Sequence, residues 1–298
     1  MLINRTTKRE AVLPMAGQNS GVRWSQFAIA LLGVLVLGAQ DPIPVPPAST
    51  PAAPAPPPTI ENTGKPMVLP FQCTAEDIQA AGLSCSEEEP CPLYLYLTSA
   101  AAAGDRILTA GNVHSTRTTI ASVLLGSDDA GHTWREVFEH VRGAGLDHLQ
   151  FLDAQTGWAS GEILVPLQQD PFLLVTTDGG SSWRKKAIFT ESRENRFGAV
   201  QQYSFPMKDS GSLIVDRGKG ADGDRYELYE SPDGGDSWTI KETSTKPLTL
   251  KVPPPVSTDW RVRADGPTSS FHIEHRQGQK WTSVAGFAVK LNACKVVP

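Results

Sequence analysis

A short polar turn that ends in tryptophan occurs four times along this chain. Three copies follow the pattern Ser/Thr-x-Asp-x-Gly-x-Ser/Thr-Trp and span residues 127–134, 176–183 and 231–238. A degenerate fourth copy spans residues 274–281 and keeps only the glycine and the tryptophan. The four tryptophans are 49, 55 and 43 residues apart. A turn that recurs at such intervals requires similar structural units in succession, so it constrains the fold strongly.

The residue types of this pattern are those of a β-hairpin turn. The aspartate carboxylate can accept hydrogen bonds from backbone N–H groups of its own turn, and the Ser and Thr hydroxyl groups can bond locally. The glycine can adopt the left-handed conformation, and the tryptophan can bury a large ring between sheets. We therefore assign structural roles to Ser127, Asp129, Gly131, Trp134, Thr176, Asp178, Gly180, Trp183, Ser231, Asp233, Gly235, Trp238, Gly278 and Trp281.

The repeat extends beyond the turn into runs with strand-like sequences. Residues 119–125 precede the first copy, and residues 225–230, which alternate polar and apolar side chains, precede the third. The second unit is the most complete and indicates four short strands joined by three turns between Phe151 and Trp183. A unit of four strands that repeats about every 40–50 residues is typical of a propeller blade. The sequence therefore predicts an all-β chain that forms a small β-propeller of about four four-stranded blades.

The turn resembles the Asp box, also called the bacterial neuraminidase repeat. The longer unit, Phe-x-Asp…Gly-Trp…Gly…Thr-x-Asp-Gly-Gly-x-x-Trp, is similar to the repeat of the photosystem II stability and assembly factor propellers. The similarity covers roughly residues 91–288, and it is carried by Phe151, Asp153, Gly157, Trp158, Gly161, Thr176, Asp178, Gly179, Gly180 and Trp183. It implies a propeller architecture. Those assembly factors have seven blades, whereas this chain has room for about four.

The front of the chain has the composition of an export signal followed by a spacer. Residues 27–39 form an apolar run behind Arg23, a length that suits a signal-peptide core and is short for a membrane span. We interpret residues 1–40 as either a signal peptide or an uncut signal anchor. Residues 41–58 contain nine prolines, so residues 41–66 are predicted to be an extended, disordered linker. The propeller domain is then expected over residues 67–298.

Two further elements are expected inside this domain. A helix is predicted only near Thr74–Ala81, where Thr74 can cap it and Gly82 can end it. Residues 287–291 are predicted to form a closing strand.

The chain has four cysteines, Cys73, Cys85, Cys91 and Cys294. An even number in an exported chain indicates disulfides, and three pairings of four cysteines exist. We favour Cys85–Cys91, which are close in sequence, with Cys73–Cys294, because a propeller brings its two ends together. The spacing lacks the close cysteine pairs of a zinc site.

Charge and composition exclude several functional classes. The net charge of −5 and the pI of about 5.7 argue against nucleic acid as a partner. The basic runs 184–186 and 261–263 are interpreted as solvated strand or loop ends. The six histidines form no metal-binding pattern, and residues 222–224 lack the ligand spacing of a calcium loop. We therefore expect no metal and no cofactor.

Asp boxes are also common in the sialidases, where they lie at the blade periphery, so the resemblance raises a catalytic interpretation. That resemblance would require an arginine cluster, a tyrosine nucleophile with a carboxylate partner, and an acid. Arg106-Ile107-Leu108 approaches the family's Arg-Ile-Pro motif without its proline. Tyr226 with Glu227 or Glu230 is the nearest tyrosine–carboxylate pair, although strand alternation explains it equally well. No catalytic residue is assigned.

The sequence thus favours an exported, non-catalytic β-propeller that binds another envelope protein or complex as a scaffold or assembly factor. We expect it in the periplasm or outside the cell, either free or held at the cytoplasmic membrane by a tether through residues 27–39. The alternative is a carbohydrate-binding or sialidase-like glycoside hydrolase propeller. A further option is a homo-oligomer formed through exposed blade edges.

Overall fold

The structure is a computed structural model that describes residues 57–165, 169–189, 198–220, 223–251 and 259–294. All of them belong to one compact unit of the chain, Pro54–Pro298. The predicted leader over residues 1–40, with its apolar run 27–39, and residues 41–56 of the predicted linker lie outside the described residues. Within the described ranges, no helix is long and apolar enough to cross a membrane.

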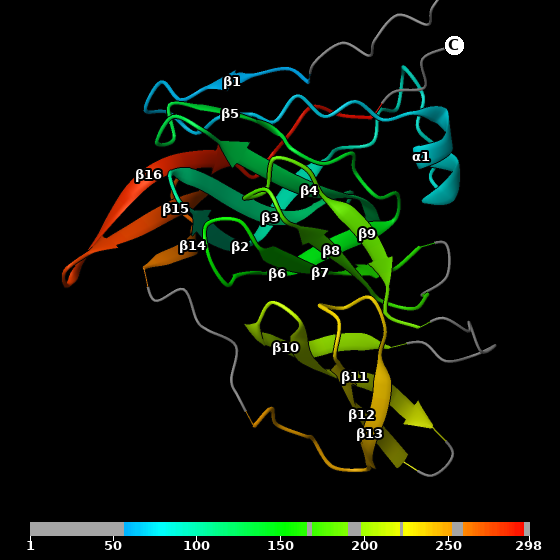
Figure 1. The fold of residues 1–298 in the computed structure, drawn as a ribbon. Helices are drawn as coiled ribbons and strands as arrows, with labels where there is room; N and C mark the ends of the chain where they lie inside the picture. Colours follow the sequence, from blue (N-terminus) through cyan, green and yellow to red (C-terminus); the bar gives the residue numbers. More distant parts are fainter. Residues whose placement is uncertain (1–56, 166–168, 190–197, 221–222, 252–258, 295–298) are drawn as a thin grey trace, which may run out of the picture. The chain divides into compact units, whose positions relative to one another are not determined.

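Four antiparallel sheets make up the domain (Figure 1). The first has the strand order β1-β5-β4-β3-β2, the second β6-β7-β8-β9, the third β10-β11-β12-β13 and the last β14-β15-β16. The described residues form sixteen strands and one short helix, so the predicted all-β class is confirmed.

The strand bounds are as follows. The first sheet contains β1 (Ile60–Glu61), β2 (Tyr94–Ala103), β3 (Arg106–His114), β4 (Thr119–Ser127) and β5 (Thr133–Glu136). The second contains β6 (Ala144–Phe151), β7 (Gly157–Ile163), β8 (Phe172–Thr176) and β9 (Arg184–Ala187). The third contains β10 (Ala199–Met207), β11 (Ser210–Gly220), β12 (Gly223–Ser231) and β13 (Thr239–Ser244). The last contains β14 (Trp260–Asp265), β15 (Ser270–Gln277) and β16 (Lys280–Ala288).

Apolar side chains pack the last sheet against the first, the first against the second, and the second against the third. β14 packs against β2, β6 packs against β2, β3 and β4, and β10 packs against β7. A buried cluster lies at each of these three boundaries. Trp134 meets Phe287 between the last and first sheets, Leu108 and Leu146 belong to the cluster between the first and second, and Trp158 stacks on Phe205 at 4.0 Å between the second and third. This succession of packed meanders is that of propeller blades. The predicted small β-propeller of about four blades is therefore confirmed, with five, four, four and three strands per sheet.

Burial along the strands follows from this packing. Almost every residue of β4 is buried, because the first sheet is covered by the last sheet on one side and by the second on the other. β13, at the edge of the third sheet, is exposed along most of its length.

The N-terminal segment of the domain joins two sheets. β1 pairs with β5 through Ile60 and Trp134, and Met67 forms a parallel bridge with Phe287 of β16. Residues 60–66, which the sequence assigned to a disordered linker, thus include a strand, so the domain starts before residue 67. The predicted closing strand over residues 287–291 belongs partly to β16 and continues beside β2, where the Leu95 N–H donates to the Val289 carbonyl at 2.7 Å.

Both favoured disulfides are formed. Cys73–Cys294 joins the N-terminal segment to the tail with a Cα–Cα distance of 5.5 Å, and Cys85–Cys91 closes a short loop with a Cα–Cα distance of 5.3 Å. The predicted helix is α1 (Ala75–Ala80), and Thr74 caps it by accepting a hydrogen bond from the Asp77 N–H at 3.1 Å.

Candidate functional site

In the three clear copies of the turn, the aspartate accepts a set of short hydrogen bonds. Asp129 accepts from the N–H and hydroxyl of Thr133, at 2.8 and 2.6 Å, and from the Ser127 hydroxyl at 2.8 Å. The Ser127 hydroxyl accepts from the Gly131 N–H at 2.8 Å. The same contacts join Asp178 to Thr176 and Ser182, and Asp233 to Ser231 and Ser237.

These contacts show that the turns hold the chain in shape. The hydrogen bonds from Thr133 lower the pKa of Asp129 to about 2, so this carboxylate stays ionised. Trp134 and Trp183 are buried, and each indole N–H donates to the carbonyl of the glycine three residues earlier at 3.2 Å. Trp238 is partly buried against the cluster between the second and third sheets.

The fourth copy of the turn does not match the other three. The clear copies join the third and fourth strands of the meanders β2–β5, β6–β9 and β10–β13. Gly278 and Trp281 lie instead in the hairpin between β15 and β16, the second and third strands of the last sheet. Trp281 is only partly buried and lies under the Arg261 guanidinium, 4.1 Å from its ring centroid. The predicted core role of Trp281 is therefore wrong, because this hairpin lacks the aspartate that shapes the other turns.

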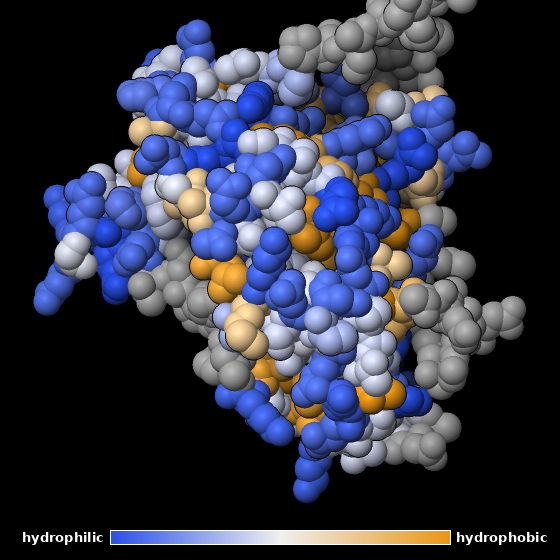
Figure 2. Space-filling model, in the orientation of Figure 1, coloured by the Kyte–Doolittle hydropathy of each residue, from blue (hydrophilic) through white to orange (hydrophobic). Residues whose placement is uncertain are grey.

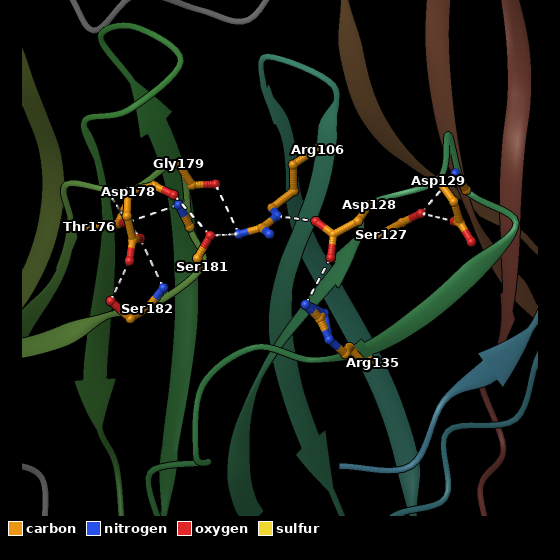
Figure 3. Close-up of polar contacts among 12 residues, drawn as sticks. Arg106, Ser127, Asp128, Asp129, Arg135, Thr176, Asp178, Gly179, Ser181 and Ser182 are labelled. Atoms are coloured by element: carbon orange, nitrogen blue, oxygen red, sulfur yellow. Dashed lines mark hydrogen bonds and ion pairs between the residues drawn. The ribbon is translucent and has the colours of Figure 1, made fainter. Parts of the chain in front are cut away.

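Arg106 links the first two turns (Figure 3). It lies at the start of β3 and forms an ion pair with Asp128 of the first turn, which also pairs with Arg135 at 2.8 Å. Its guanidinium also donates to the Ser181 hydroxyl at 2.6 Å and to the Gly179 carbonyl at 3.5 Å, both in the second turn. Arg106, whose surrounding sequence approaches the sialidase Arg-Ile-Pro motif, thus bridges two sheets. Its side chain is only 17% exposed.

A groove of about 190 Å³ lies between the second and third turns. Its buried residues are Thr156, Trp158 and Val175 of the second sheet. Exposed and half-buried charged residues surround them: Arg184, Lys186, Lys208, Asp209, Asp233 and Asp236. Lys186 forms an ion pair with Asp236 across the boundary, and burial together with Arg184 lowers the pKa of Lys186.

The tyrosine–carboxylate pair differs from the one considered in the sequence. Glu227 is joined by Tyr229, whose hydroxyl donates to it at 2.6 Å, and by Arg217 at 2.7 Å. The β-strand alternation places Tyr226 on the opposite face from Glu227. Glu227 has no exposed surface and Tyr229 is 8% exposed, so this cluster is part of the packing between the second and third sheets.

Of the two basic runs singled out in the sequence, one lines the groove and the other lies apart from it. Arg184 and Lys186 line it, although the run 184–186 was interpreted only as a solvated end. Arg261 and Arg263 both donate to Glu274 at 2.7 Å. Asp222 lies outside the described residues, and among the described ones no group of three or more His, Cys, Asp or Glu residues is placed to hold a metal.

A pair of carboxylates in the second sheet was not predicted from the sequence. Glu162 in β7 lies opposite Gly145 of β6, and Asp147 lies two residues further along β6, beside an irregularity in the strand pairing. Burial, and then the neighbouring Asp147, raise the pKa of Glu162 to about 7. Burial also raises the pKa of Asp147. An acidic residue in each of the strand-like segments 144–151 and 157–163 is the signal that could have revealed them.

Exposed apolar side chains occur singly. Figure 2 shows a mostly hydrophilic face with small, separate hydrophobic patches. Among the large hydrophobic residues described, Met207 and Tyr96 are the most exposed, at 62% and 51%. Apolar side chains scattered in this way do not by themselves mark a docking surface.

No protein-family model and no curated protein matches this sequence. Solved structures match it distantly. The GH74 xyloglucanase from Xanthomonas campestris has 22% identity and a TM-score of 0.35, and the match covers 46% of this chain and 19% of that chain. YCF48 bound to a D1 peptide has 17% identity and a TM-score of 0.34, with 72% of this chain and 60% of that chain covered. The alpha-L-arabinanase of Penicillium chrysogenum has 14% identity and a TM-score of 0.33, with 67% of this chain and 63% of that chain covered. This chain thus spans less than two thirds of each of these proteins. At such similarity, neither their activities nor their partners transfer to it.

Proposed function

We propose that this chain is an exported, non-catalytic β-propeller of the Asp-box type that binds another envelope protein as a scaffold or assembly factor. The binding site that we assign to this role is the groove between the second and third turns.

The groove is the observation that carries this proposal. Small-molecule sites usually enclose about 300–1,000 Å³, whereas this groove has about 190 Å³. That volume suits one side chain of a protein partner. The mixed charges around it favour a polar interface that is specific in orientation.

The chemistry of the other polar clusters supports a non-catalytic role. The Tyr229 hydroxyl and the Glu227 carboxylate bind each other and Arg217, and they are buried. A nucleophile in this state cannot reach a substrate without a rearrangement of the packing between two sheets. The two disulfides support export, because such bonds persist in oxidising compartments.

Site-specific photo-crosslinking tests this function. A photoreactive amino acid at Lys208, beside the groove, should give a discrete adduct with one envelope protein in cells. The same amino acid at Lys280, in the exposed hairpin of the last sheet, is the control and should not give that adduct. Identical adducts at both positions, or none at Lys208, would contradict the proposed function.

A second candidate, glycoside hydrolysis, is favoured by one observation. Glu162 has a pKa of about 7 and lies close enough to Asp147 for that carboxylate to raise its pKa, and a protonated acid paired with a second carboxylate is what glycosidases use. Hydrolysis of aryl glycosides by the wild type, with at least a hundredfold loss in Glu162→Gln, would establish this candidate. No hydrolysis over the wild type's stable pH range would remove it.

A further inference from the structure

The boundary between the first and second sheets shows how this fold holds a guanidinium group. Arg106 precedes Ile107, which pairs with Ser127, the first residue of the first turn. From this position its guanidinium reaches Asp128 and, in the next sheet, the Gly179 carbonyl and the Ser181 hydroxyl. The space between two successive turns thus accepts one planar cation (Figure 3).

The corresponding position at the next boundary has no such side chain. Gly157 pairs with Thr176, the first residue of the second turn, so Thr156 is the counterpart of Arg106. The Gly234 carbonyl and Asp236 are the counterparts of the Gly179 carbonyl and Ser181. Thr156, Gly234 and Asp236 all line the groove. The groove therefore lies where the repeat would place a guanidinium group.

Its lining offers acceptors for such a group. The side chain of Asp209 has no hydrogen bond or ion pair within the described structure. The Gly234 carbonyl accepts one hydrogen bond, from the Trp158 indole at 3.1 Å, and can accept a second. Asp236 is paired with Lys186, which comes from the outer strand β9, and a carboxylate can accept more than one donor.

We propose that this groove is a seat for an arginine side chain of the partner protein, which rests on the proposed scaffold function. A guanidinium group matches it better than an ammonium group, because its planar set of donors can reach a carboxylate and a carbonyl at once. Arg184 and Lys208 repel further cations. The partner segment is therefore expected to present a single arginine with neutral or acidic neighbours.

The test uses acetyl-L-arginine amide as the probe and acetyl-L-citrulline amide as its neutral control. Titrated into the full chain, the arginine probe should give saturable shifts of the Thr177 and Gly234 amide resonances, and the control should bind at least tenfold more weakly. Thr156→Arg should abolish the shifts, because its own side chain would fill the groove. Asp209→Asn should weaken binding at least threefold.

Arg106→Thr provides the reciprocal variant. It should open a second seat, with new probe-dependent shifts at Gly179 and Ser181.

Equal binding of the two probes, undiminished binding to a folded Thr156→Arg variant, or no saturable shift in the wild type would each overturn the seat. If the Lys208 adduct persists in Thr156→Arg, the arginine seat is wrong but the scaffold function stands. If the arginine probe binds but no adduct forms at Lys208, the scaffold function is wrong and the arginine seat stands.

Discussion

The Asp178 carboxylate accepts three hydrogen bonds inside its turn, from the Ser182 N–H and hydroxyl and from the Thr176 hydroxyl. Hydrogen bonds to a charged group contribute about 1.5–3 kcal/mol. We therefore expect Asp178→Ala to lower the free energy of unfolding by about 1.5–3 kcal/mol, measured by urea denaturation. Asp209→Ala is the matched control and should change it by less than about 0.5 kcal/mol, because that side chain is exposed and unpartnered in the described structure. Equal losses in both variants would contradict the role of the turn.

Glu162 predicts a specific pH dependence. Its pKa is raised from 4.5 to about 7, so between these values the folded chain holds a proton that the unfolded chain has released. Stability should therefore fall as the pH rises from about 4.5 to about 7, and should change little from this group above that range. Because the carboxyl is only partly buried, we expect a contribution of about 1–2 kcal/mol.

Melting temperatures between pH 4.5 and 8 test this expectation. In Glu162→Gln the fall over this window should become smaller, since the amide does not titrate. Glu242→Gln, at an exposed position of β13, should retain the wild-type profile. An unchanged profile in Glu162→Gln would assign the effect to another group.

At the residue scale, the sequence predicted side chains whose roles are local. Asp129, Asp178 and Asp233 bond within eight-residue segments, so their roles follow from the pattern alone. Glu162 was missed because its pKa depends on Asp147 in a neighbouring strand and on burial between sheets. The burial of Trp281 was predicted wrongly, because a glycine followed by a tryptophan also occurs in the β15–β16 hairpin, which lacks the aspartate of the other turns.

At the element scale, the turns should differ in how much they stabilise the fold. Trp134 is fully buried, packs edge-on against Phe287 of the last sheet and donates to Gly131. Trp134→Ala should therefore lower the free energy of unfolding by about 3–5 kcal/mol. Trp281→Ala should cost only about 1 kcal/mol, the value of an exposed cation–π contact. Urea denaturation of the two variants measures the difference, and a larger loss for Trp281→Ala would refute this ranking.

The strands and the helix could be predicted where the signal was local. Thr74 marks the start of α1, and the alternation over residues 225–230 marks β12. β1 could not be predicted, because its two residues are held by pairing with β5 rather than by their own composition. Ile60 lies opposite Trp134, which is more than seventy residues away in sequence. An extended segment after many prolines has the same local signature whether or not it meets a sheet edge.

At the scale of the whole molecule, the repeat length sufficed to predict successive four-stranded units, since each unit is a local meander. The groove could not be predicted, because it forms between two turns of different sheets. The groove is open because Thr156 occupies the position in the second sheet that Arg106 occupies in the first. The equivalence of these two positions becomes visible only once the strand registers are known.

The two disulfides should contribute unequally to stability. A disulfide stabilises mainly by restricting the unfolded chain, more so for a longer loop. The separation is 221 residues for Cys73–Cys294 and six for Cys85–Cys91. We expect removal of the long-range bond, in Cys73→Ser with Cys294→Ser, to lower the free energy of unfolding by about 5 kcal/mol, and removal of the short-range bond by about 2–3 kcal/mol. Urea denaturation of the two double variants provides the comparison. Equal losses would contradict the expected dependence on loop length and would point instead to the pairing of Leu95 with Val289 and of Met67 with Phe287, which already restrains the two ends of the domain.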